Sequence, residues 1–190
     1  MKKLIAVLMS LCLLLGSVAA IAETANTGAA VVETANTESK DVFITPDVKF
    51  GMTADEVIKA NGNAKYERDT ENAIPGMKLD ELEYENLEIM GVRAEVKYYF
   101  LNNKLIGVQV KFDDNTSMYN KMKEQLTEKM GEGVKPDANA LGMAIYLADD
   151  DAKLEANSLA WIKDSTMAVL EQDDDDVKVT VVNLSDELTK

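Results

Sequence analysis

The sequence predicts an α+β fold in two layers, an antiparallel sheet meander with short helices on one side. Many short runs alternate apolar and polar residues, which is typical of half-buried strands. Turn-forming Asn, Asp and Gly residues separate these runs at short intervals, which favours antiparallel neighbours. Two other stretches show helix caps and helical spacing. Helices packed on an antiparallel sheet are a common solution for burying one face of each element.

The first helix is expected over residues 53–62. Thr53 is a good N-cap, and Glu56 stands three residues later, which completes a capping box. Asn61 and Gly62 both tolerate the left-handed conformation that ends a helix. A helix of about two turns is not stable alone, so it must pack on another element.

A loop is expected over residues 63–76, followed by strands. In residues 81–85 apolar and acidic residues alternate, which places Leu82 and Tyr84 in the core. Asn86 breaks this phase before it resumes. The break is either a bulge within one strand or a turn between two strands.

The clearest hairpin spans residues 92–112, and alternate residues are apolar on both of its arms. A two-residue turn at Asn102-Asn103 would set the apolar face of one arm against the polar face of the other. A three-residue loop over residues 102–104 instead pairs Tyr98 with Val108. The sequence therefore predicts the longer loop.

A second helix is expected to begin at Thr116 or Ser117 and to end at Gly131. Asp-rich turns then separate short apolar runs, which predicts a second meander. The layout resembles an internal repeat of a helix followed by strands, with units at residues 50–112 and 116–183. The apolar runs are residues 143–147, 159–162, 167–170 and 177–182.

The N-terminal residues 1–22 have the pattern of a cleavable signal peptide. Two lysines precede an apolar stretch, and Ala20-Ile21-Ala22 fits the cleavage site. Residues 23–40 are small and polar, which predicts a disordered linker. Residues 41–190 are expected to form a single α+β domain. We therefore expect a secreted or periplasmic protein whose mature chain does not insert into a membrane.

The composition excludes several kinds of chemistry. The chain has a net charge of −14, and removing a signal peptide with two lysines and no acid leaves −16. So acidic a chain is a poor match for nucleic acid or anionic lipid. There is no histidine, and Cys12 in the signal peptide is the one cysteine. A histidine-based triad, disulfides and cysteine zinc sites are therefore excluded from the mature chain, and no cofactor is expected.

The stretch Gly51-Met52-Thr53-x-x-Glu56-Val57, ending in Asn61-Gly62, resembles the helix start of β-lactamase-inhibitor-protein-like domains. The small lipoproteins of the outer-membrane barrel-assembly machinery have a similar start. Trp161, late in the second unit, also fits the inhibitor-like pattern. The resemblance implies a non-enzymatic domain that binds another protein with its sheet face or loops. The chain departs from this group because it has neither a lipoprotein cysteine motif nor disulfides.

A candidate interaction surface lies on the polar face of the hairpin. It combines charged side chains with one outward aromatic residue, as protein-binding surfaces often do. An ordinary solvated sheet face is the alternative. The candidate residues are Glu95, Lys97, Tyr99, Gln109 and Lys111.

The predicted function is therefore that of an exported protein-binding module without catalytic activity. One alternative is an acidic calcium-binding module of the cell envelope, because carboxylate oxygens suit Ca²⁺. A second alternative is a small carboxylate-based hydrolase, which would need two carboxyl groups in a cleft. The candidate calcium ligands are Asp173, Asp174, Asp175 and Asp176, although they lack the spacing of an EF-hand loop.

Overall fold

The computed structural model describes residues 45, 47–74, 77–113, 116–136, 157–172, 176–183 and 185. All of them belong to one compact unit, Asp41–Lys190. The predicted signal peptide, the predicted linker and the apolar run 143–147 lie outside the described residues.

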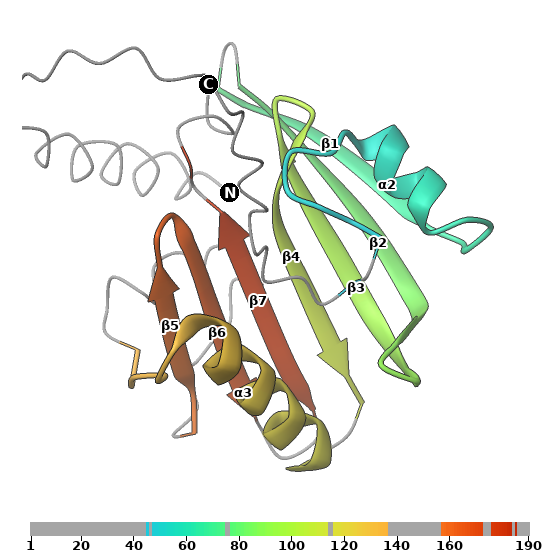
Figure 1. Ribbon diagram of the computed structural model, residues 1–190. Helices are drawn as coiled ribbons and strands as arrows, with labels where there is room; N and C mark the ends of the chain where they lie inside the picture. Colours follow the sequence, from blue (N-terminus) through green and yellow to red (C-terminus); the bar gives the residue numbers. More distant parts are fainter. Residues whose placement is uncertain are drawn as a thin grey trace, which may run out of the picture. The chain divides into compact units, whose positions relative to one another are not determined.

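Within the described part of the chain, seven strands form one antiparallel sheet in the order β1-β2-β3-β4-β7-β6-β5 (Figure 1). Two short helices accompany the sheet, so the predicted α+β class with an antiparallel meander is confirmed. The elements are α2 (Ala54–Ala60), β1 (Glu67–Ile74), β2 (Met77–Ile89), β3 (Val92–Leu101), β4 (Lys104–Phe112), α3 (Thr116–Met130), β5 (Leu159–Lys163), β6 (Thr166–Gln172) and β7 (Val177–Asn183).

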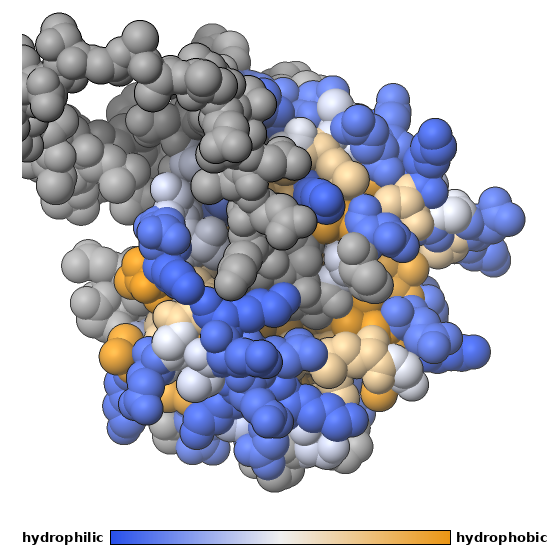
Figure 2. All heavy atoms as spheres, viewed as in Figure 1, coloured by the Kyte–Doolittle hydropathy of each residue, from blue (hydrophilic) through white to orange (hydrophobic). Residues whose placement is uncertain are grey.

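Both helices pack on the same face of the sheet. Val57 from α2 and Met122 from α3 join one core cluster with alternate residues of the strands, such as Val96 and Val179. Helix α3 lies across β5, β6 and β7 (Figure 1). Its outer surface is hydrophilic (Figure 2). The helices therefore cover one face of the sheet, as the sequence predicts.

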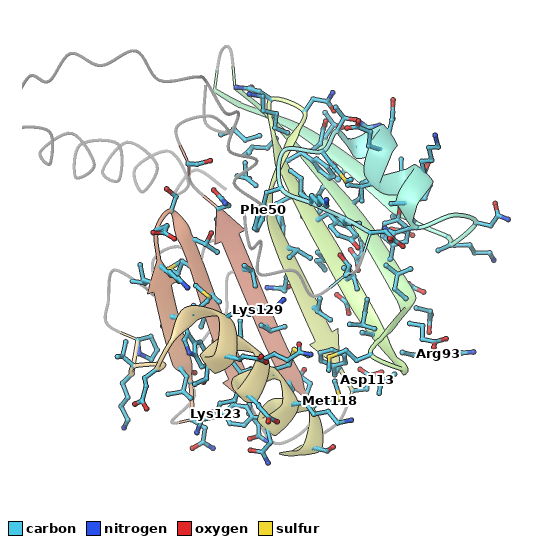
Figure 3. All side chains as sticks on the ribbon, in the orientation of Figure 1. Phe50, Arg93, Asp113, Met118, Lys123 and Lys129 are labelled. Atoms are coloured by element: carbon cyan, nitrogen blue, oxygen red, sulfur yellow. The ribbon has the colours of Figure 1, made fainter. Side chains whose placement is uncertain are left out.

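The buried residues of α3 follow the predicted helical spacing. Met122 and Leu126 are buried, and so is Met118, whereas Lys123 is exposed (Figure 3). The helix ends at Gly131, whose φ of 91° suits a residue without a Cβ. These methionines therefore belong to the core.

The hairpin of β3 and β4 has a shorter turn than the predicted three-residue loop, and that prediction is wrong. Leu101 pairs with Lys104, which leaves Asn102-Asn103 as a two-residue turn. Both asparagines have positive φ, 49° and 64°, as a type I′ turn requires. A register shift one residue further on restores the pairing of Tyr98 with Val108. A bulge, and not a longer loop, therefore brings the apolar faces of the two strands together.

Strand β2 resolves the alternative left open at Asn86. The strand is continuous from Met77 to Ile89, and its pairing with β3 shifts between Tyr84 and Leu87. The phase break is therefore a bulge. The turn to β3 comes later, at Met90-Gly91, where both residues have positive φ.

Strand β1 contradicts the prediction of a loop over residues 63–76. It pairs with β2 at the edge of the sheet, from Glu67 opposite Glu83 onward. The sequence has no apolar alternation here because β1 has Arg68 and Thr70 on the helix side of the sheet, where both remain exposed. Both bond to the buried Asp80 of β2. Because these contacts are polar, hydrophobic periodicity does not reveal β1 as a strand.

Without the edge strand β1, the strand order is symmetric about the pair of β4 and β7. The meander β2-β3-β4 and the meander β5-β6-β7 meet where β4 pairs with β7. This is the arrangement expected if residues 50–112 and 116–183 are repeats. The repeat itself stays a prediction.

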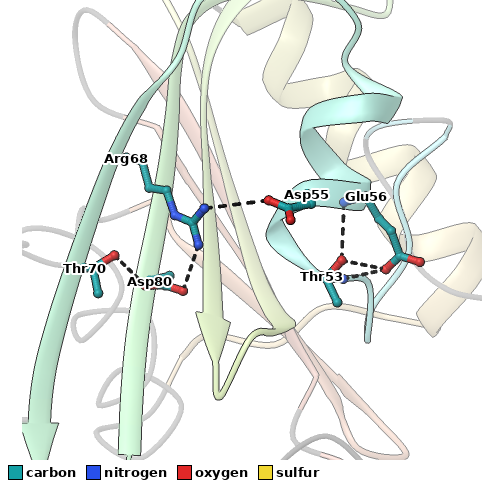
Figure 4. Close-up of polar contacts among 6 residues, drawn as sticks. All are labelled: Thr53, Asp55, Glu56, Arg68, Thr70 and Asp80. Atoms are coloured by element: carbon teal, nitrogen blue, oxygen red, sulfur yellow. Dashed lines mark hydrogen bonds and ion pairs between the residues drawn. The ribbon is translucent and has the colours of Figure 1, made fainter.

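Helix α2 has the predicted capping box. The Thr53 hydroxyl accepts the Glu56 N–H at 3.3 Å, and the Glu56 carboxylate accepts the Thr53 N–H at 2.8 Å (Figure 4). These backbone and side-chain hydrogen bonds from Thr53 lower the pKa of Glu56 below its ordinary value of 4.5. The cap thus favours the charged form of Glu56 in the folded state.

We expect Thr53→Ala to lower the free energy of unfolding by about 1 kcal/mol at neutral pH. A carboxyl group whose pKa is lowered by folding stabilises the fold above its unfolded pKa. That contribution is lost as the pH falls below 4.5, the ordinary pKa of the group, and then through its lower pKa in the folded state. The difference between Thr53→Ala and the wild type should therefore shrink in acid. Urea unfolding at neutral and acid pH measures both effects, with Ser165→Ala in an exposed turn as the control. An equal deficit at both pH values would contradict this coupling.

Candidate functional site

The candidate surface predicted from the hairpin lies on the sheet face opposite the two helices. Glu95 pairs with Lys111 and Lys97 pairs with Gln109, so these side chains share one face. Tyr99 pairs with Gly107 on the same face. The structure therefore brings the five predicted residues together in two adjacent strands.

Lys97 is at the centre of three carboxylates. Its Nζ lies 3.3 Å from Glu83, 3.6 Å from Glu95 and 3.9 Å from Glu81. Burial of the ammonium group opposes its charge, but these carboxylates outweigh that effect and raise the pKa of Lys97. Lys97 therefore stays charged at neutral pH and partly neutralises its three neighbours.

The same face becomes strongly acidic toward the edge strand β1. Glu67 pairs directly with Glu83, and Asp69 pairs directly with Glu81. Carboxylates directly opposite each other on one face repel, which destabilises a sheet. Glu67 and Asp69 are exposed. We define the acidic face as Glu67, Asp69, Glu81, Glu83, Glu95, Lys97 and Tyr99.

Two of the predicted residues differ from this exposed group. Gln109 is only 7% exposed and donates to the Thr180 hydroxyl at 3.2 Å, so its side chain forms part of the interior. Lys111 forms an ion pair with Asp176 at 2.9 Å. The hydrogen bond from Lys111 to Asp176 is the main reason that the pKa of Lys111 is raised. The solvent-accessible side chains of this face therefore lie mainly toward β1 and β2, and not on β4.

The candidate calcium ligands fall mostly outside the described residues, which do not include Asp173, Asp174 or Asp175. Asp176 is described, and its carboxylate bonds to Lys111. Among the described residues, no group of three or more acidic side chains is arranged to hold a metal ion.

A second polar cluster lies on the helix side of the sheet, and sequence reasoning missed it. The Asp80 side chain is fully buried, and it accepts from the Thr70 hydroxyl at 2.6 Å (Figure 4). It also accepts from the Arg68 guanidinium at 3.3 Å. The same guanidinium lies 3.8 Å from Asp55 of α2. Arg68 thus joins the edge strand β1 to both β2 and α2.

A signal for this cluster exists in the sequence. Asp80 continues the alternation of Leu82 and Tyr84 and therefore falls on the core face of β2. A charged residue at a core position requires a partner of opposite charge. That requirement points to a basic residue on a neighbouring strand, which is Arg68.

Comparisons with family models, with curated proteins and with solved structures found no match to this chain. The resemblance to inhibitor-like domains therefore remains an expectation from the sequence. None of the described helices combines the length and apolar composition needed to cross a membrane.

Proposed function

We propose that this protein is an exported, non-enzymatic module that binds another protein through its acidic face. The observation that carries the proposal is the direct pairing of Glu67 with Glu83 and of Asp69 with Glu81. Like charges in such pairs cost folding stability. Lys97 forms ion pairs with the β2 members of these pairs, Glu81 and Glu83, whereas the β1 members Glu67 and Asp69 are exposed. A partner with a basic surface would relieve the repulsion on binding.

The rest of the acidic face fits this role. Tyr99 pairs with Glu81, which places an aromatic ring next to the carboxylates. Aromatic residues are enriched in protein interfaces, because a rigid ring buries a large area at low entropic cost. Complementary charge would speed the encounter and select the partner. The supporting helices lie on the opposite face and leave this face to the strands in the described part of the chain.

Export and the internal repeat belong to the same proposal. Export rests on the signal-like residues 1–22, and the repeat rests on the matching helix-and-meander order of the two halves. Together they describe a module that meets its partner outside the cytoplasm.

The experiment is a pull-down of residues 23–190 against secreted and envelope proteins, in calcium and in chelator. A saturable partner with a basic surface supports the proposal. Binding that requires calcium would favour the calcium-dependent alternative. The absence of a partner in both conditions would refute a stable protein-binding role.

Neutralising the exposed acids of β1 provides a sharper prediction. We expect Glu67→Gln with Asp69→Asn to weaken partner binding about tenfold, or about 1.4 kcal/mol. Folding stability should rise slightly, because the substitutions remove two repulsive pairs. Binding and stability thus change in opposite directions, which a general folding defect cannot produce. Isothermal calorimetry and urea unfolding measure the two quantities.

The matched control is Glu124→Gln with Glu128→Gln on the exposed surface of α3. It removes the same charge from the helix side of the sheet. Equal loss of binding in both double variants would show that only net charge matters. That result would reject the acidic face as the binding surface.

A further inference from the structure

Strand β1 forms one edge of the sheet, and in the described part of the chain it pairs with β2 alone (Figure 1). Its first residues, Glu67, Arg68, Asp69 and Thr70, are all exposed. The backbone N–H and C=O groups on the outer side of an edge strand can pair with a further strand. The outer edge of β1 is therefore accessible to another chain.

One hydrogen bond shows which backbone groups of β1 face outward. The Thr70 N–H donates to the Asp69 carboxylate at 2.7 Å, so this amide bonds to a side chain of its own strand. Backbone groups alternate in direction along a strand, and those of Arg68 therefore face the same way as those of Thr70. The outer edge thus presents the backbone of Arg68 and Thr70.

Pairing in the neighbouring strands gives the same direction. Leu101 and Lys104 flank a two-residue turn, so their backbone groups bond to each other. Phe100 alternates with Leu101 and therefore bonds toward β2, where Asp80 is its partner. The backbone groups of Asp80 are thus used toward β3. Thr70 pairs with Asp80 on its other side, so the backbone groups of Thr70 point to the outer edge.

The charges along this edge alternate with the backbone. Glu67 and Asp69 belong to the acidic face, whereas Arg68 and Thr70 bond to Asp80 on the helix side of the sheet. Negative charge therefore recurs at every second position along the exposed part of β1. A strand added here would place its own alternate side chains directly opposite Glu67 and Asp69.

These charges disfavour a second copy of this chain as the added strand. Outward-facing residues of one copy would have to pair with outward-facing residues of the other. Whether Arg68 paired with Arg68 or with Thr70 of the copy, Asp69 would lie opposite an acidic residue, and like charges in such pairs repel. Charged residues on an edge strand protect a protein against such self-pairing. The edge therefore selects a strand of opposite charge.

We propose that β1 binds an extended segment of another protein as an added antiparallel strand with a basic side chain at every second position. The inference rests on the proposed function, because it assigns a binding mode to the same acidic face. The segment would exchange hydrogen bonds with the backbone of Arg68 and Thr70. Its basic side chains would lie opposite Glu67 and Asp69, and opposite charges in cross-strand pairs stabilise a sheet.

The bond within β1 would change when the segment binds. A carbonyl group of the added strand would replace the Asp69 carboxylate as the acceptor of the Thr70 N–H. The released carboxylate would then face a basic side chain of the segment. Backbone pairing would give the contact its direction and register, and charge would select the partner.

A synthetic peptide with alternating lysine and threonine tests the proposal, with isothermal calorimetry as the measurement. The probe has eight residues, the length of β1. In the proposed register its threonines pair with Arg68 and Thr70, and its lysines face the acids. We expect saturable binding that weakens about tenfold or more when the backbone amides of the threonines are N-methylated. Methylation removes hydrogen bonds to β1 and keeps the charge.

A second peptide of the same composition, with its lysines gathered at one end, is the matched control. It has the same charge but cannot place lysines at alternate positions, so we expect it to bind more weakly than the probe. If the N-methylated or the rearranged peptide bound as tightly as the probe, charge alone would hold the peptide. That result would overturn strand addition and leave the acidic face as the binding surface.

Amide hydrogen exchange locates the bound peptide. With saturating peptide, we expect exchange at the Arg68 and Thr70 N–H groups to slow about tenfold or more. Exchange at Asp164, in the exposed turn between β5 and β6, should stay unchanged. Unchanged exchange at both β1 amides with the peptide bound would overturn the proposal. Protection in the free protein that grows with its concentration would indicate a second copy on the edge, and it would overturn the proposal as well.

Failure of strand addition is distinguishable from failure of the proposed function. A partner from the pull-down that needs Glu67 and Asp69 but leaves the Arg68 and Thr70 amides unprotected refutes strand addition alone. Absence of binding by the lysine peptide, with such a partner present, also refutes strand addition alone. If neither a partner nor the peptide binds, both proposals are refuted.

Discussion

Replacing Trp161 with alanine should lower the free energy of unfolding by about 3–5 kcal/mol, the range for truncating a buried aromatic residue. Trp161 is 1% exposed and lies in the core under α3. Its Nε1 donates to the Gly131 carbonyl at 3.0 Å, just after the helix ends. A Cβ built on Gly133 would lie 2.6 Å from the indole ring, so the backbone there packs directly on it. The substitution therefore removes a large apolar contact and the hydrogen bond to the Gly131 carbonyl.

Urea unfolding followed by circular dichroism measures this loss. The matched control is Ile162→Ala at the next position of β5, where the side chain is 67% exposed on the other face. That control should stay within about 0.5 kcal/mol of the wild type. If both variants lost stability equally, the indole would not be the contact that fixes α3 to the sheet.

The sequence predicts the central elements because burial follows periodicity there. Val96, Tyr98 and Val108 alternate with polar residues, and all three are buried. The capping box at Thr53 was equally visible, because it depends only on residues three positions apart. Local patterns of this kind are independent of how the strands pair.

The turn of the β3–β4 hairpin shows where such reasoning fails. The predicted pairing of Tyr98 with Val108 is correct, but a bulge achieves it rather than a longer loop. The alternation of apolar residues fixes only which residues of the two strands face each other. A three-residue loop satisfies this condition, and so does a two-residue turn followed by a one-residue bulge. The choice between them depends on the positive φ at both asparagines, which matches the twist of the strands.

The acidic face was only half predictable for a related reason. The sequence placed Lys97 and Tyr99 on one surface from alternation within β3. It could not place Glu67 and Asp69 beside them, because β1 lacks the apolar alternation that marks a strand. The strongest feature of the face, the like-charge pairs, emerges only from the pairing of β1 with β2.

Replacing Arg68 with alanine should lower the free energy of unfolding by about 2–3 kcal/mol. Removing one partner of a fully buried ion pair costs about 3–5 kcal/mol, because the remaining charge loses its compensation. The Asp80 side chain is fully buried, whereas Arg68 remains 35% exposed, which reduces the expected cost. Arg68 also lies 3.8 Å from Asp55, so the variant should loosen α2 as well as the edge strand β1.

A double-mutant cycle separates the buried charge from the rest of the arginine side chain. Asp80→Asn in the Arg68→Ala background removes the charge that the arginine compensates, and an amide oxygen can still accept from Thr70. We expect the double variant to be more stable than Arg68→Ala alone. The control Arg93→Ala, at an exposed position of β3, should change stability by no more than about 0.5 kcal/mol. A double variant less stable than Arg68→Ala would mean that Arg68 supports the sheet edge by packing, and not by compensating Asp80.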